Sequence, residues 1–172
     1  MYILILDSNQ LKRKRIPIEL QKIGVYMLIN KNDLPLVAMD FMNDTHFEDT
    51  EIINEVYKYI LEYEKEQNEL NLKSLEDKYK EWITHTENHF ETEEIQMREK
   101  GFFAYEFHKN EHNMNLSEIK QLFDNFEEHK NILELKNYFE NNLANWLINH
   151  IQTMDTVTAM FFKTGMTPCS MH

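Results

Sequence analysis

Residues 53–61, INEVYKYIL, place apolar side chains at Ile53, Tyr57, Ile60 and Leu61. The steps between these positions are mostly three or four residues, which puts the side chains on one face of an α-helix. Similar steps recur through the long, charged region that makes up most of the chain. We therefore predict a protein built mainly from helices.

Short connections separate the expected helices. Gly101 stands where a glycine commonly follows a helix end, and Ser74 with Asp77 resembles a capping box at a helix start. Short connections between long helices make neighbours antiparallel. The predicted fold is an all-α, up-down-up-down four-helix bundle, with helices over residues 44–69, 74–100, 104–128 and 131–163.

Glycine and proline are scarce, at three residues each in a chain of 172. A sheet-rich fold needs turns that use these residues, so the shortage argues against a β-sandwich, a barrel or a disordered linker. Hydrophobic residues make up 42% of the chain, enough to fill one core. The formal net charge of −12 argues against nucleic acid or an anionic membrane as the main partner.

No segment of the sequence is typical of a secreted or membrane-bound protein. The single cysteine, Cys169, cannot form an intrachain disulfide, which fits a reducing compartment. No apolar run approaches the ~20 residues of a membrane span. The apolar start, residues 2–6, has no basic residue before it and no small-residue cleavage site after it. We expect a soluble, cytoplasmic protein.

We divide the chain into an N-terminal extension (1–35), a helical bundle (36–163) and a C-terminal tail (164–172). The extension carries six basic and three acidic side chains, whereas the rest of the chain is strongly acidic. Within it we expect strands over residues 2–6 and 25–29, with a short helix between Pro17 and Gly24. The basic run at 12–15 is interpreted as a solvated loop, the alternative being a docking patch. Residues 1–35 are therefore the candidate segment for a protein partner or for self-association.

Histidine and carboxylate side chains recur in pairs along the expected helices. Two residues four apart on an α-helix point the same way, whereas a five-residue step leaves about 140° between them. In an antiparallel square all these side chains fall at the same end of the bundle. Five imidazoles and two carboxylates suit a pair of borderline first-row ions such as iron. The set is His46, the pairs His89/Glu93 and His108/His112, and the wider pair His150/Asp155.

Four fragments carry a resemblance to the hemerythrin family, in its bacterial single-domain branch, over residues 36–162. They are FMNDTH, which ends at His46, HFETEEIQM from 89, HKNEH from 108 and WLINHIQTMD from 146. The resemblance implies an oxo- or hydroxo-bridged di-iron centre with dioxygen bound end-on at an open position of the second iron. It further implies a ligand set in which His108, His112 and His150 hold one iron, His46 and His89 hold the other, and Glu93 and Asp155 bridge them.

The sequence departs from the family between the first two ligand fragments. The 43 residues from His46 to His89 exceed the usual interval, so the first two helices must be longer or joined by a longer loop. His85 lies one turn before His89 on the same face, and we expect it to have a structural or supporting role rather than to bind iron. His129 and His172 are expected to be solvated.

Apolar side chains flank the expected ligands. The resemblance implies that they line a pocket over the open iron position, and as core residues at that level they would also pack the bundle. An apolar wall excludes water and protons, which would otherwise help reduced oxygen to leave as peroxide and leave the irons oxidised. These residues are Phe90, Trp146, Leu147 and Ile151.

The expected function is reversible dioxygen binding at a non-heme di-iron centre, for storage, delivery or sensing, rather than catalysis. Ferritin-like oxidases use carboxylate-rich sites with Glu-x-x-His motifs. Here no Glu stands three residues before any of the ligand histidines His89, His108, His112 and His150. The alternative is a di-iron enzyme or protective protein that handles nitric oxide, peroxide or iron for damaged clusters. Relatives of the repair type usually add a cysteine-bearing N-terminal domain, and residues 1–35 contain no cysteine.

Overall fold

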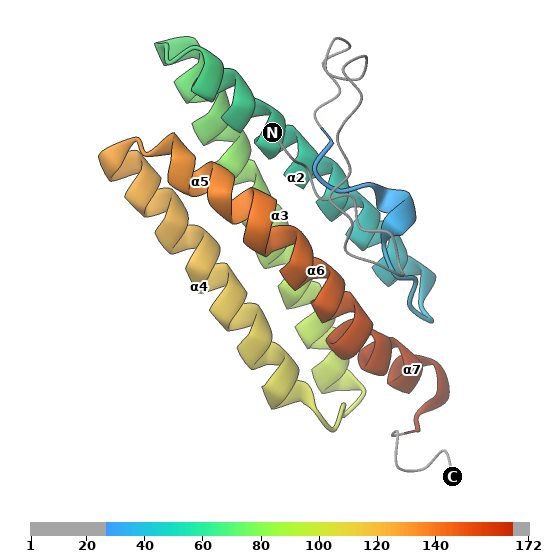
Figure 1. The fold of residues 1–172 in the computed structure, drawn as a ribbon. Helices are drawn as coiled ribbons and strands as arrows, with labels where there is room; N and C mark the ends of the chain where they lie inside the picture. The colour runs from blue at the N-terminus through green and yellow to red at the C-terminus, as the bar shows by residue number, and fades with distance from the viewer. Residues whose placement is uncertain (1–26, 167–172) are drawn as a thin grey trace.

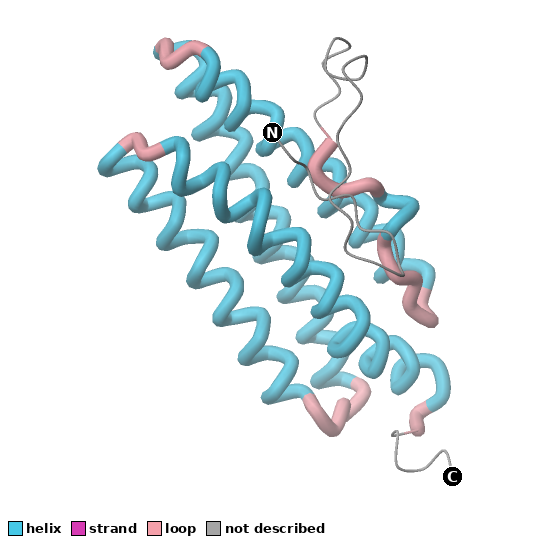
Figure 2. Tube along the Cα trace, viewed as in Figure 1, coloured by secondary structure: helices cyan, strands magenta, loops and turns pink. Residues whose placement is uncertain are grey.

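A computed structural model describes residues 27–166, and in this range the chain is helical with no strand. Four antiparallel helical columns lie side by side in an up-down-up-down arrangement (Figures 1 and 2). The prediction of an all-α four-helix bundle is confirmed. The columns are α2 (Asp40–Lys65), α3 (Glu69–Glu99), α4 (Tyr105–His129) and a fourth built from α5 (Ile132–Tyr138), η2 (Phe139–Leu143), α6 (Ala144–His150), η3 (Ile151–Asp155) and α7 (Thr156–Thr164).

The long interval between the first two ligand fragments is taken up by helix. Only residues 66–68 separate α2 from α3, so both helices are extended rather than joined by a long loop. The capping box predicted at Ser74 is wrong, because α3 begins five residues earlier and the Ser74 hydroxyl donates to the Leu70 carbonyl within the helix. Asn68 caps α3 instead, as its side-chain oxygen accepts from the Asn71 amide at 2.8 Å.

The end of α3 follows the expectation for Gly101. Its φ of 65° lies in the left-handed region that glycine adopts without strain. The next amide, that of Phe102, donates back to the Met97 carbonyl at 2.8 Å. This motif turns the chain directly into α4.

The fourth column contains two wider turns, η2 and η3, in which the backbone forms π-helix rather than α-helix. In η3 the amide of Thr156 donates to the Ile151 carbonyl, five residues back. Short π segments of this kind often occur at functional sites. Here η3 lies immediately after His150 and ends on Asp155.

The apolar core extends along the bundle and reaches the level of these ligands at Met42, Leu147 and Ile151. Aromatic rings dominate it: Tyr79 stacks on Phe123 with centroids 4.6 Å apart, and Trp82 meets Phe139 edge-on at 5.2 Å. Leu135 is fully buried in the same cluster. The buried ligands therefore lie within an apolar and aromatic core.

Residues 27–37 pack along α2. Ile29 and Leu34 are buried against the core, and η1 (Lys31–Asp33) lies between them. The predicted strand at 25–29 is wrong over its described part, 27–29, where the backbone bends and bonds to the Asn54 side chain instead of to another strand. The Asn54 Oδ1 accepts from the amides of Leu28 and Ile29 at 2.7 and 3.0 Å, and its Nδ2 donates to the Ile29 carbonyl at 2.8 Å.

Several predictions concern residues outside the described part of the chain. They are the strand at 2–6, the helix between Pro17 and Gly24, the basic run at 12–15 and the solvated His172. Within residues 27–166, no helix is both long enough and apolar enough to cross a membrane.

Candidate metal centre

Seven histidine and carboxylate side chains from all four columns converge at one level of the bundle. Six of them have at most 4% of their surface exposed, and the seventh, His89, has 10% of its side chain exposed. Burying so many ionisable groups is costly unless they are paired or bind a metal. The structure brings together every residue that the sequence predicted as a ligand: His46 on α2, His89 and Glu93 on α3, His108 and His112 on α4, His150 on α6 and Asp155 at the end of η3.

One half of the cluster contains three imidazoles and a carboxylate. One ligand atom from each of Glu93, His108, His112 and His150 lies within 4.8 Å of the others. The Nε2 atoms of His108 and His150 are 3.1 Å apart, and the Glu93 Oε2 lies 3.5 Å from the Nε2 atoms of both His108 and His112. These lone pairs point at a common centre, which is the arrangement that a bound cation requires.

Asp155 lies between this half of the cluster and the other. Its Oδ1 is 3.3 Å from the Nε2 atoms of His108 and His150, whereas its Oδ2 is 3.1 Å from the Nε2 of His46. The rings of His46 and His89 lie next to each other, with centroids 5.6 Å apart. One carboxylate therefore presents its two oxygens to two separate groups of imidazoles.

The wide turn η3 explains how Asp155 reaches this position. A regular α-helix would leave about 140° between residues five apart, which made Asp155 the least direct of the expected ligands. A π-helix closes its hydrogen bonds over five residues instead of four. The five-residue step from His150 to Asp155 thus becomes a step along one face, and both side chains enter the cluster.

Neighbouring polar groups orient three of the imidazoles. The Thr158 hydroxyl donates to the Met154 carbonyl, so its oxygen accepts from Nδ1 of His108 at 2.9 Å and leaves the Nε2 lone pair facing the cluster. Glu94 lies 3.4 Å from Nδ1 of His112 and also pairs with Lys109. Such outer partners fix the tautomer and direction of a ligating histidine.

Asp49 has the same role toward the other half. Its Oδ2 lies 2.9 Å from Nδ1 of His89, and its Oδ1 lies 2.9 Å from Nε2 of His85. Burial opposes ionisation of Asp49, but the two imidazoles outweigh it and hold the pKa of this carboxyl below its usual range. His85 thus contacts the outer carboxylate, a turn away from the centre of the cluster.

The donor set fits a metal centre. Buried atoms of His46, Glu93, His112, His150 and Asp155 have no hydrogen-bond partner within the described residues. Burial and the adjacent Asp155 raise the pKa of Glu93, because two carboxylates cannot both ionise comfortably there. Burial, His108 and His150 lower the pKa of His112 to about 2, which keeps its imidazole neutral. The neutral His112 imidazole and the two repelling carboxylates at this site favour the binding of a cation.

A small apolar cavity of about 20 Å³ adjoins the cluster. Its wall includes Phe90, Trp146 and Leu147, and it reaches His89 and His150. Phe90 stacks on the His112 ring at 3.9 Å, and Trp146 stacks on the His150 ring at 4.7 Å. Ile151 does not line the cavity and is fully buried in the bundle core.

Comparison with known proteins agrees with this geometry. The chain is 31% identical to a bacteriohemerythrin from Aquifex aeolicus (strain VF5) over 133 residues, which is 77% of this chain and 96% of that protein. The chain belongs to the hemerythrin family. No family model matches it, and no solved structure matches it significantly. The four-helix bundle and its buried histidine and carboxylate cluster agree with membership of this family.

The sequence analysis missed the outer partners of this hemerythrin's cluster. Asp49 follows His46 by three residues, so helical spacing alone would have placed it on the same face as this ligand. Glu94 directly follows Glu93, and Thr158 lies one turn after Asp155. Each could have been found by asking which polar side chains lie within one turn of a ligand, although similar residues are common on any charged helix.

Proposed function

We propose that this hemerythrin binds dioxygen reversibly at a non-heme di-iron centre, for storage, delivery or sensing. The observation that carries the proposal is the position of Asp155, whose two oxygens face two separate groups of imidazoles beside an apolar cavity. A single metal ion would not use both groups. The name of the curated relative, a bacteriohemerythrin, supports the same conclusion.

We assign the ligands by the two groups that the geometry separates. His108, His112 and His150 would hold one iron, and His46 and His89 would hold the other. Glu93 and Asp155 would bridge the pair, as the contacts of Asp155 on both sides suggest. A nitrogen-rich donor set of this kind favours iron over the harder, oxygen-preferring cations.

The remaining residues would protect the site rather than drive a reaction. A di-iron centre held by the seven ligands would supply the electrons for reversible dioxygen binding. Phe90, Trp146 and Leu147 present apolar surface to the cavity beside His89, which would keep bulk water from the site. The cavity volume is about 20 Å³, slightly more than the roughly 10–15 Å³ that one water needs. A cavity of this size suits a small ligand such as a diatomic molecule. The largely apolar wall keeps bulk water away from the site, which would favour oxygen binding over its further reduction.

Metal analysis of the purified protein tests the centre itself. We expect close to two irons per chain, with the loss of iron when His112 or Asp155 is replaced. One zinc and no iron would refute the proposal, because zinc prefers four tetrahedral ligands and would leave three of the seven unused. The cytoplasmic location and the role of residues 1–35 in partner binding or self-association remain predictions of the sequence.

A further inference from the structure

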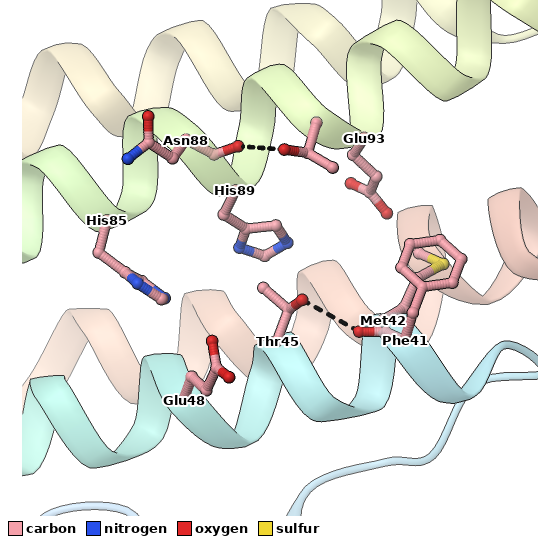
Figure 3. Close-up of a pocket in the computed structure, with 9 residues that line it drawn as sticks. Phe41, Met42, Thr45, Glu48, His85, Asn88, His89 and Glu93 are labelled. Atoms are coloured by element: carbon pink, nitrogen blue, oxygen red, sulfur yellow. Dashed lines mark hydrogen bonds between the residues drawn. The ribbon is translucent and has the colours of Figure 1, made fainter.

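A second, larger cavity opens between α2 and α3 on the same part of the bundle. Its volume is about 240 Å³, and it extends from the surface to His89 and Glu93. Figure 3 shows Glu48 on α2 and His85 on α3 reaching toward one another at one end, with Thr45 and His89 between them and Glu93. The cluster is thus approached by two cavities of different size that share His89.

The two cavities differ in chemistry. The small one has apolar walls and room for about one water. The large one has carboxylates at both ends, exposed Glu48 at the mouth and buried Glu93 at the inner end, with imidazoles between. Its volume admits an ion together with its hydration water. Exposed Glu48 at the mouth favours a cation over an anion that arrives from solvent, and His89 and Glu93 at the inner end offer it ligand atoms.

The side chains at the mouth are ligand types that iron accepts. Glu48 is exposed, and the His85 side chain is 26% exposed, so both can meet an ion arriving from solvent. Asp49 holds the His85 ring in place from inside, with its Oδ1 at 2.9 Å from Nε2. Four residues farther along α3, His89 points into the same cavity, so an ion can pass from one imidazole to the next.

We propose that this cavity is the entry route for hydrated Fe²⁺, and that Glu48 and His85 hold the ion transiently before it reaches His89 and Glu93. The inference rests on the proposed di-iron function and adds a loading site outside the seven ligands. An entry route changes the rates of iron uptake and release by the same factor. It leaves the amount of iron bound at equilibrium unchanged, which distinguishes Glu48 and His85 from true ligands.

The test compares Glu48→Lys with a matched control, Glu91→Lys. Glu91 is an exposed carboxylate two residues after His89, so on the helix it lies about 200° away from the cavity. Both variants change the net charge equally. The full-length reduced protein is mixed anaerobically with a chelator to measure iron release, and the refolded metal-free chain is mixed with Fe²⁺ to measure uptake. His85→Gln is measured in the same way.

We expect Glu48→Lys to slow uptake and release on the order of tenfold, with two irons still bound at equilibrium, because focused charge changes association rates by about 10-fold or more. His85→Gln should slow both rates by a smaller factor. Glu91→Lys should match the wild type. Equal rates in Glu48→Lys and the wild type, or equal slowing in both lysine variants, would overturn the entry route. Failure of the wild-type protein to bind iron would instead refute the proposed function.

Discussion

Replacement of Leu147 by alanine should weaken the apolar wall of the small cavity while sparing the ligands. Leu147 is 5% exposed, lies three residues before His150, and lines the cavity beside His89. The change removes three buried carbon groups, each worth about 0.8 kcal/mol of transfer free energy, or about 2.4 kcal/mol together. The void left behind adds to this cost, which places the total within the usual range of about 2–5 kcal/mol.

The structural consequence is a cavity that admits several waters. The existing volume of about 20 Å³ would join the space vacated by the leucine side chain. We expect the oxygenated protein to autoxidise several-fold faster, since water and protons then reach the site, while iron content stays at the wild-type level. A loss of about 3 kcal/mol should also lower the melting temperature by roughly 6–12 °C.

The control is Leu135→Ala, which removes a fully buried leucine from α5 in the aromatic core. It should lower the melting temperature by a similar amount without changing the rate of autoxidation. Stopped-flow absorbance at equal iron content measures that rate, and thermal unfolding measures stability. Equal autoxidation rates in Leu147→Ala and the wild type would refute the reasoning that Leu147 excludes water from the site.

Three further experiments test other parts of the structure. His85→Ala should retain nearly two irons per chain, whereas His112→Ala should lose iron; equal losses in metal analysis would show that the ligand register on α3 is wrong. Asp49→Asn removes the carboxylate 2.9 Å from a ligand imidazole and should lower iron affinity about 10–100-fold in a chelator competition, so unchanged affinity would argue against an orienting role. Asn54→Ala removes the bonds that hold the backbone at 28–29 and should cost about 1–3 kcal/mol in chemical denaturation with iron content unchanged. An unaltered unfolding free energy would mean that this packing adds nothing to stability.

The helical periodicity of the apolar residues was sufficient to predict most of the fold. The three- and four-residue steps around Tyr57 mark a buried stripe, and the structure buries Ile53, Tyr57 and Ile60 as that pattern requires. The boundary between the first two helices was harder to predict from the sequence. Asn68 and Ser74 are both good cap residues, and only the packing of the extended helices selects the first of them.

The convergence of the seven candidate ligands also followed from spacing and antiparallel topology. The position of Asp155 did not, because a π turn shifts the hydrogen-bond register by one residue, and apolar periodicity does not encode that shift. The larger cavity could not be predicted either, since Glu48 and His85 come together only through the packing of α2 on α3. The roles of these residues depend on distances between helices, which no single-helix pattern contains.

Repeated cycling of the anaerobically reduced protein between air and argon, followed by visible absorbance, tests the central claim most directly. The account predicts a protein with two irons per chain whose absorbance rises in air, falls under argon and rises again over several cycles. A single, irreversible change on the first exposure to air would contradict reversible dioxygen binding.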